Sequence, residues 1–423
     1  MSKSLSSPPL RLWLIVAALL LATALASHNM SHDFLWWDET ISTQIAGTGI
    51  NGPLLLSQIW HNASADPWHP PGFFLLLNGW ARLFGASQFS LRLFPFLTGI
   101  LTLAWTYRLG VWTGGRRVGL AALVILSGAA YFLDMMTELR PYMMYALFGV
   151  MSVALYWRLR SGKAQRERPD LMTFSMSILG LLYAHYFASL IVAVLAGYHL
   201  LFTRRDRQWW RIATSALIGA LLFVPWLVVF ATAVRISTGN QRFDALNTGD
   251  FLRLLADGIS NGVLPFLLVL VPGIVVAWRS GSGRFLLWLF GLYLVLALIV
   301  NQWLHLLTHL RYIIALWGGA AVVAGYGVVW LRRQPSFGKL LVAALVIAWW
   351  SVAAYQTLTP DFRNRMFREQ FISFFRPNLP LYDALRTIQP KLQADDIVLY
   401  DAPDSPWAVS GAFDYYTGDW TIS

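Results

Sequence analysis

The stretch from Phe285 to Leu304 reads FLLWLFGLYLVLALIVNQWL and contains no charged residue. A helix of about 20 apolar residues is long enough to cross the hydrocarbon core of a bilayer. Similar apolar runs recur along the chain from Leu12 to Tyr355, which leaves no room for a soluble domain inside that span. The sequence therefore predicts an all-α polytopic membrane protein.

The composition points the same way. Of the 423 residues, 57% are hydrophobic, 15% are aromatic and only 13% are charged, and the mean hydropathy is +0.53. A soluble domain usually carries about a quarter charged residues. The net charge of +11 does not indicate a nucleic-acid partner, because Lys and Arg lie in short clusters between apolar runs. The absence of cysteine excludes disulfides and thiolate metal sites.

The basic clusters predict the topology. They are separated by pairs of apolar segments and lie at 116–117, 158–168, 204–211, 279–284 and 332–339. The positive-inside rule places all of them in the cytoplasm. We expect about eleven transmembrane helices, near 11–28, 90–110, 118–134, 141–158, 171–185, 186–203, 211–232, 262–278, 285–304, 311–331 and 339–355. The N-terminus is then cytoplasmic, and the first run, which resembles a signal peptide, stays as an uncleaved helix.

The chain divides into a transmembrane core at 1–355 and an external region at 356–423. A long first external loop, 29–89, contains the apolar stretch from Gly72 to Phe84. If that stretch crossed the bilayer, every later basic cluster would change sides, so we expect a juxtamembrane helix on the outer surface. The external C-terminal region predicts a small α/β domain, with a strand at 395–400, and its completeness stays open.

Ionisable residues accumulate at the outer ends of the expected helices, where desolvation is costly. Asp38 and Glu39 follow an aromatic pair, Trp36 and Trp37, in the first external loop. A carboxylate there can act as a general base or can bind a divalent metal ion through oxygen ligands. Adjacent acids are common, so the pair alone is a weak signal, and the convergence of polar residues from six stretches favours a site.

Three arginines begin expected helices at their outer ends: Arg92, Arg140 and Arg311. Helix N-termini and guanidinium groups both favour phosphate oxygens, so each arginine is a candidate phosphate ligand. For any single arginine, interfacial snorkelling is at least as good an interpretation.

Further polar residues near the same face are candidate substrate ligands: His69, Glu138, His185 and Tyr186. His185 sits at a tight external turn, where a histidine is more often a hydrogen-bonded structural residue than a catalyst. His305 and His309 have the i, i+4 spacing that two metal ligands on one helix face would need, but a third ligand is missing nearby. A metal site therefore stays unassigned.

Several short motifs, taken in order, resemble those of a known superfamily. They are Trp37-Asp-Glu-Thr40, His69-Pro-Pro-Gly-Phe-Phe-Leu-Leu-Leu77, Leu83-Phe-Gly85, Leu91-Arg-Leu-Phe-Pro95, Glu138-Leu-Arg-Pro-Tyr142, Tyr183-Ala-His-Tyr186 and Arg311-Tyr312. Their order and spacing resemble the polyprenyl-phosphate-sugar-dependent glycosyltransferases of the GT-C fold, the protein O-mannosyltransferase-like superfamily, in its bacterial membrane branch. The resemblance covers roughly Leu12 to Trp330.

The resemblance implies a membrane glycosyltransferase that moves a sugar from a polyprenyl-phosphate donor, with inversion, to an envelope acceptor. It implies an acidic base in the first external loop, at Asp38, with Glu39 in support, and an arginine that stabilises the leaving phosphate. Lipid A, lipopolysaccharide core, another glycan or a protein are acceptors of this kind. The implied location is the bacterial inner membrane, with the active site facing outward.

Two other readings stay open from the residues alone. A polytopic transporter or lipid-linked glycan flippase would also line a cavity with arginines and acids, although transporters more often show inverted repeats and charges at mid-membrane. An envelope polymerase or ligase would also use lipid-linked glycans. The polar residues gather at one surface and no repeat is evident, which favours an outward-facing enzyme.

Overall fold

The computed structural model describes residues 10–28, 30, 35–48, 53–65, 67–163, 166–239, 247–304, 307, 309–335, 337–359, 387 and 391. All regular elements in this part of the chain are helical. In chain order they are α1 (Leu10–Ser27), α2 (Trp37–Ala46), α3 (Leu56–Ala65), α4 (Gly72–Phe84), α5 (Gln88–Gly114), α6 (Arg116–Ser127), α7 (Ala130–Met135), α8 (Tyr142–Arg160), α9 (Glu167–Ala184), α10 (Ala188–Phe202), α11 (Arg207–Leu221), α12 (Val224–Gly239), α13 (Thr248–Ser260), η1 (Leu264–Val269), α14 (Leu270–Trp278), α15 (Gly281–Leu304), η2 (Leu310–Ile313), α16 (Leu316–Arg332) and α17 (Gly338–Leu358).

Helices α5, α6, α8 and α16 form the centre of the bundle and pack closely on one another. Glycines bring the helix axes together: a Cβ at Gly110 of α5 would lie 2.7 Å from the Cα of Gly119 of α6. Small residues at such crossings allow the close backbone contact that associates helices in membranes. Leu201, Leu268 and Leu340 remain exposed on outer helix faces. Apolar side chains on the outside and a tightly packed centre are what a lipid solvent requires.

The count of expected spans needs correction. By length and composition, three of the described helices can cross a membrane: α5, α15 and α17. Two bent pairs, α11 with α12 at 55° and α13 with η1 and α14 at 81°, bring the number to five. The apolar segments expected elsewhere do form helices, but α10 has 15 residues and α16 has 17. The protein is a multi-pass membrane protein, and eleven full-length spans are not found in its described part.

Two hydrogen bonds from a side chain distant in the sequence explain why the helix expected at 118–134 is broken into α6 and α7. The Asn261 side chain donates to the Gly128 carbonyl at 2.9 Å and accepts from the Ala130 amide at 2.9 Å. These bonds replace the helical bonds that the break removes, so the exposed backbone groups stay satisfied. Local sequence cannot predict this break, because Asn261 lies far along the chain.

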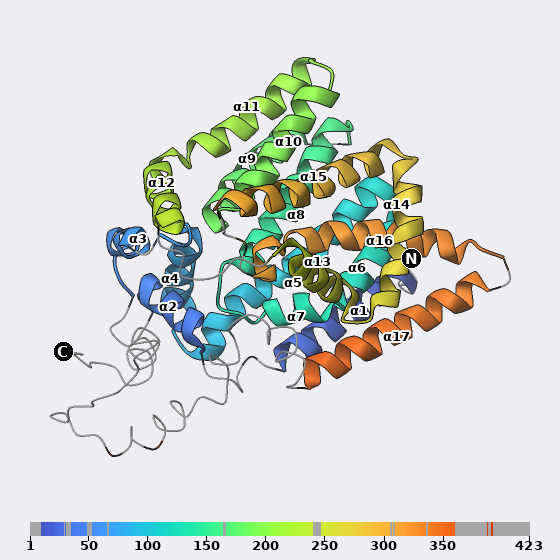
Figure 1. Cartoon of the computed structure of the whole chain (residues 1–423), viewed down its shortest axis with the longest axis horizontal. Coiled ribbons are helices and arrows are strands. Elements are labelled where there is room, and N and C mark those ends of the chain that lie inside the picture. Colours follow the sequence, from blue (N-terminus) through green and yellow to red (C-terminus); the bar gives the residue numbers. More distant parts are fainter. Residues whose placement is uncertain are drawn as a thin grey trace, which may run out of the picture.

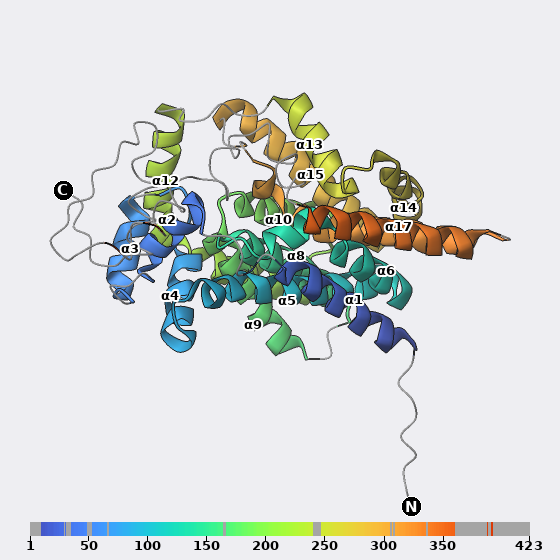
Figure 2. The ribbon, with the colours of Figure 1, turned by 90° about the horizontal axis from the view of Figure 1, so that it is seen from below.

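The first external loop is helical, as expected, with α2, α3 and α4 ahead of α5. Helix α4 buries Phe73, Phe74 and Leu77 and exposes Leu76 and Leu83, so it is partly embedded in the bundle. Helices α2, α3, α4 and α12 gather at one end of the molecule, and α14 and α17 lie toward the other end (Figures 1 and 2). The expected α/β domain at 356–423 falls almost wholly outside the described residues.

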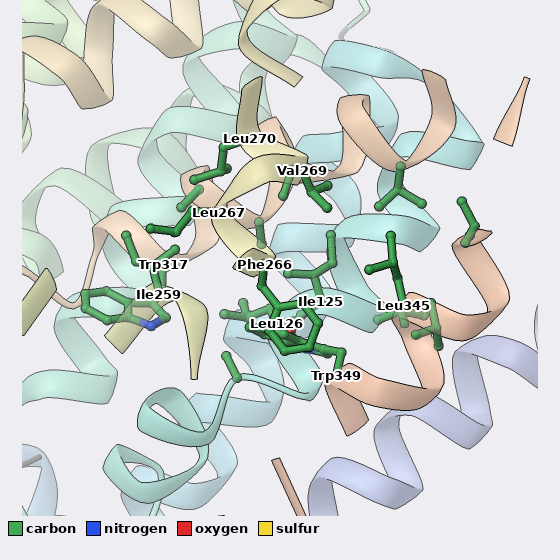
Figure 3. A pocket seen from close by; sticks show the side chains of 18 residues that line it. Ile125, Leu126, Ile259, Phe266, Leu267, Val269, Leu270, Trp317, Leu345 and Trp349 are labelled. Atoms are coloured by element: carbon green, nitrogen blue, oxygen red, sulfur yellow. The ribbon is translucent and has the colours of Figure 1, made fainter. Parts of the chain in front are cut away.

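An apolar cavity lies between α6, α13, η1, α14, α16 and α17, and the space inside it, with its open side included, is about 770 Å³ (Figure 3). Ile125, Phe266, Leu270, Trp317 and Leu345 are among its lining residues. It extends along α16 from Trp317, just after η2, to Val328 near the other end of the helix.

Candidate active site

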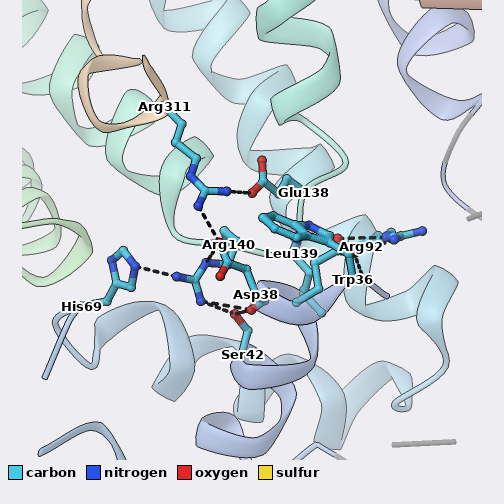
Figure 4. Close-up of polar contacts among 10 residues, drawn as sticks. Trp36, Asp38, Ser42, His69, Arg92, Glu138, Leu139, Arg140 and Arg311 are labelled. Atoms are coloured by element: carbon cyan, nitrogen blue, oxygen red, sulfur yellow. Dashed lines mark hydrogen bonds and ion pairs between the residues drawn. The ribbon is translucent and has the colours of Figure 1, made fainter. Parts of the chain in front are cut away.

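Helix α2 presents two neighbouring carboxylates in its first turn, Asp38 and Glu39. Acids at this position interact favourably with the positive end of the helix dipole. Glu39 also accepts a hydrogen bond from the Trp36 amide at 3.2 Å, which satisfies a backbone donor at the helix start. Asp38 lies beside Arg140 and Arg311 (Figure 4), whereas Glu39 pairs with Arg92.

Glu39 is held by a buried arginine fork. Arg92 of α5 donates Nε to Oε1 at 3.1 Å and Nη2 to Oε2 at 2.6 Å. The Leu139 amide adds a third donor to Oε1 at 2.8 Å. The Glu39 and Arg92 side chains are only 1% and 5% exposed. With all these donors in place, the pair ties α2, α5 and the segment before α8 together.

Asp38 has a different partner, Arg311 of η2. The Arg311 Nη2 donates to Asp38 Oδ2 at 2.6 Å, and its Nη1 donates to Glu138 Oε1 at 2.8 Å. Arg311 therefore bridges two carboxylates that lie a hundred residues apart. The Asp38 side chain keeps 16% of its surface exposed, whereas Glu138 is 1% exposed. Asp38 is the carboxylate of this cluster that solvent or a substrate can reach.

Aromatic rings enclose the Arg311 guanidinium. Its Cζ lies 5.2 Å from the centre of the Trp36 ring and 5.1 Å from the centre of the Tyr142 ring. Cation–π contacts of this kind strengthen when the cation is desolvated. The rings fix the plane of the guanidinium, so its two ends are aimed at Asp38 and Glu138.

Arg140 is the second arginine beside Asp38. Its Nη1 donates to the Asp38 carbonyl at 3.0 Å and to the Ser42 hydroxyl at 3.2 Å, and its Nε lies 3.8 Å from Asp38 Oδ2. Its Nη2 lies 2.6 Å from His69 Nε2. A guanidinium can only donate, so His69 accepts at Nε2 and carries its proton on Nδ1. Among the described residues, that Nδ1 has no hydrogen-bond partner.

His185 and Tyr186 lie at the turn between α9 and α10. His185 Nδ1 accepts from the Phe187 amide at 3.2 Å, and its ring stacks on Tyr145 with centroids 5.1 Å apart. The His185 and His69 rings are 5.5 Å apart, so His185 borders the cluster. Tyr186 points elsewhere: its hydroxyl donates to the Pro67 carbonyl at 2.9 Å. Tyr186 therefore supports the loop that carries His69.

Burial and charge shift the pKa values of these groups in ways that suit an anion site. Burial alone would raise the pKa of Asp38, but the charges of Arg140 and Arg311 together outweigh it and hold that pKa below its usual value. Burial and the same two arginines lower the pKa of His185 to about 3. They also hold the pKa of His69 well below its usual value. At neutral pH the site therefore combines an ionised Asp38 with two neutral histidines.

The structure brings most of the expected residues together. Asp38, Glu138, Arg140 and Arg311 form one cluster with His69, and His185 lies at its edge. Arg92 and Glu39 pair with each other beside it. Sequence reasoning did not single out Ser42 or Tyr142, although Ser42 lies one helical turn after Asp38 and Tyr142 follows Arg140 in the same motif.

The candidate metal ligands do not gather. Within the described ranges, no group of three or more His, Asp or Glu side chains is placed to hold a metal ion. His305 lies outside the described residues, so its expected pairing with His309 has no structural counterpart here.

The chain was compared with known families and structures. Residues 68–229 match the family model for dolichyl-phosphate-mannose-protein mannosyltransferase. No curated protein sequence matches the chain significantly. The fold is similar to that of ArnT from Cupriavidus metallidurans, in the apo state, with a TM-score of 0.67 and 13% identity over 96% of this chain and 85% of ArnT. ArnT bound to undecaprenyl phosphate gives 0.65 and 14%, over 97% of this chain and 85% of ArnT.

A second solved relative is more distant. The archaeal oligosaccharyltransferase AglB from Archaeoglobus fulgidus, in complex with an inhibitory peptide and a dolichol-phosphate, has a TM-score of 0.57 and 13% identity, over 96% of this chain and 64% of AglB. Residues 68–229 are thus similar to the dolichyl-phosphate-mannose-protein mannosyltransferase family, and the chain shares the fold of ArnT and AglB.

Proposed function

We propose that the protein transfers a sugar, with inversion, from a polyprenyl-phosphate donor to an envelope acceptor on the outer side of the bacterial inner membrane. The acceptor is lipid A, lipopolysaccharide core, another glycan or a protein. The observation that carries this proposal is the pairing of a partly exposed carboxylate, Asp38, with a desolvated arginine, Arg311, 2.6 Å away. A base and a phosphate ligand side by side are what transfer from a sugar phosphate needs.

The reaction runs in one displacement. The acceptor hydroxyl or amine attacks the anomeric carbon, and the bond from that carbon to the phosphate oxygen breaks. Asp38 takes the acceptor's proton, and the polyprenyl phosphate leaves with the bonding electron pair. Attack from the side opposite to the phosphate inverts the anomeric configuration.

Arg311 and Arg140 are the arginines that we assign to the donor phosphate. A phosphate at Arg311 shares its guanidinium with Asp38 and weakens the arginine's hold on that carboxylate. The pKa of Asp38 then rises toward its usual value, and Asp38 becomes a stronger base when the donor is bound. Donor binding and activation of the base are linked through one guanidinium.

The remaining residues have supporting roles in this proposal. Glu39 and Arg92 satisfy each other's charge and hydrogen bonds. We therefore assign them the positioning of α2 rather than proton transfer or phosphate binding. His69 holds Arg140 and offers its Nδ1–H to an acceptor atom of the substrate. Glu138 orients Arg311. His185 and Tyr186 fix the loop around His69.

The test uses wild-type protein in nanodiscs, a panel of polyprenyl-phosphate sugars and extracted envelope acceptors, with release of polyprenyl phosphate as the readout. Arg311→Gln keeps hydrogen-bond donors but removes the charge, and Asp250→Asn at the exposed start of α13 is the control. We expect release by wild type and Asp250→Asn and a loss of at least a hundredfold in Arg311→Gln. No release with any donor, together with movement of the donor across vesicle membranes, would instead establish a flippase.

A further inference from the structure

The apolar cavity described above is separate from the charged cluster. Its walls come from α6, α13, η1, α14, α16 and α17, and its described lining contains no charged side chain. The space between these walls, about 770 Å³ with its open side included, is lined by apolar side chains.

One polar atom in the lining lacks a partner. Two tryptophans line the cavity, and Trp349 donates its indole N–H to the Ile125 carbonyl at 2.9 Å. The Trp317 indole N–H has no hydrogen-bond partner in the described part of the chain, and Trp317 is only 3% exposed. A buried donor without an acceptor is costly and usually has an explanation. An occupant of the cavity that carries an acceptor atom supplies one.

The bilayer is the accessible source of such an occupant. One wall of the cavity is α17, which buries the smallest share of its residues among the three long apolar helices. Trp349 faces the cavity, whereas Leu340 and Ile347 of the same helix are exposed. Because α17 is apolar both toward the cavity and on its exposed face, a hydrocarbon chain from the bilayer can enter the cavity beside this helix.

The position of the Trp317 indole N–H limits which class of molecule can occupy the cavity. Trp317 lies at the start of α16, shortly after Arg311 of η2, and the centre of its ring lies 5.1 Å from that of Tyr131. In a glycerophospholipid the ester carbonyls lie directly above the acyl chains, so a chain that enters the cavity brings an acceptor with it. An isoprenoid chain has no acceptor along its length and leaves the Trp317 N–H unsatisfied.

We propose that this cavity binds one fatty acyl chain of a glycerophospholipid from the leaflet on the active-site side, with the ester carbonyl accepting from Trp317. The bound chain completes the packing of α17 against α14 and α16. This lipid site is distinct from the donor site and does not depend on which sugar is transferred.

The test uses full-length protein in nanodiscs that contain phosphatidylethanolamine with a photoreactive diazirine on one acyl chain. Cross-linked residues are located by mass spectrometry. We expect cross-links to concentrate on lining residues such as Ile125, Leu270 and Leu345. Ala324→Phe, which fills the cavity, should lower this labelling at least fivefold. Leu340→Phe, on the exposed face of α17, should leave it unchanged.

A second variant keeps the test decisive if Ala324→Phe fails to fold. Trp317→Phe retains the ring and removes only the N–H, so we expect native mass spectrometry to show at least threefold less retained phospholipid. Trp278→Phe removes an exposed indole N–H outside the cavity and serves as its control. Labelling spread evenly over α17, or a polyprenyl phosphate that displaces the phospholipid from these residues, would overturn the proposal.

Discussion

At the start of α2, two adjacent carboxylates have opposite surroundings. Glu39 receives donors from Trp36, Leu139 and both sides of the Arg92 fork, and it is 1% exposed. Asp38 shares Arg311 with Glu138 and keeps part of its surface accessible. The two acids are therefore suited to different roles: Glu39 holds neighbouring segments together, and Asp38 is accessible to a substrate.

Removing the charge of Glu39 should cost stability. In Glu39→Gln, Arg92 stays buried without its anion, so we expect the free energy of unfolding to fall by roughly 3–5 kcal/mol. Glu167→Gln, at the exposed pair with Arg211, should cost about 1 kcal/mol or less. Chemical denaturation in detergent measures both. Equal losses in the two variants would mean that the buried fork does not anchor α2.

His185 should make the protein sensitive to mild acid. Its pKa is lowered to about 3 in the folded state, so below pH 6.5 the unfolded chain binds a proton that the native protein does not. The free energy of unfolding then falls on acidification from pH 7 to pH 5, by up to roughly 1.4 kcal/mol per pH unit for this group. His69 contributes in the same direction.

The measurement compares thermal unfolding midpoints at pH 7 and pH 5. His185→Gln should reduce the acid shift, and His61→Gln, at an exposed position on α3, should leave it unchanged. An identical shift in wild type and His185→Gln would show that His185 is already charged in the folded protein.

The position of α4 depends on a small residue in its first turn, Gly72. A Cβ at Gly72 would lie 2.6 Å from the Tyr183 carbonyl oxygen, so α4 touches α9 directly at this point. Gly72 follows His69-Pro-Pro, and Tyr183 precedes His185 by two residues. The contact therefore sets how the two histidines meet.

Gly72→Ala should push α4 away from α9. We expect a loss of about 1–3 kcal/mol in stability, together with reduced sugar transfer, because His69 moves with the helix start. Gly79→Ala in the same helix meets no atom within 4 Å and should be neutral or stabilising by up to about 1 kcal/mol. If both alanines behave alike, close packing at Gly72 does not position the site.

The sequence predicted some features of the helices and of the site, and others depend on contacts between distant residues. Apolar runs predicted the helices of the membrane core, because hydrophobic length is a local property, but they did not predict α13 or the separate helices α2 and α3. The break between α6 and α7 depends on Asn261, which no local pattern reveals. The convergence of Asp38, Arg140 and Arg311 was predicted from their shared helix ends, but their pairing was not. Arg92 was expected to bind phosphate, but its guanidinium donates two hydrogen bonds to Glu39 instead. Such pairing depends on three-dimensional packing, which the sequence pattern does not show.

For the whole molecule, the central question is which side of the membrane holds the charged cluster. The cluster lies at the helix ends that join α6 to α8, α9 to α10 and α15 to α16. The basic clusters at 204–211, 279–284 and 332–339 occupy the opposite ends of the helices. The positive-inside rule then predicts that the cluster faces outward.

The sequence contains no cysteine, so a single cysteine introduced at a chosen position reports which side of the membrane that position faces. Asp250→Cys, in α13, should react with a membrane-impermeant maleimide in intact cells. Arg333→Cys, between α16 and α17, should react only after permeabilisation. Both positions are exposed. Reversed labelling would place the site on the cytoplasmic side and remove the outward-facing assignment.

The central claim is that Asp38 is the base of glycosyl transfer. The direct measurement is the turnover rate of Asp38→Asn relative to wild type, with a polyprenyl-phosphate sugar that wild type uses. The variant keeps the shape of the side chain, and Arg311 keeps its bond to Glu138. We expect a folded variant whose turnover rate falls by about a hundredfold to ten-thousandfold. A folded variant with wild-type turnover would contradict it and remove Asp38 from the mechanism.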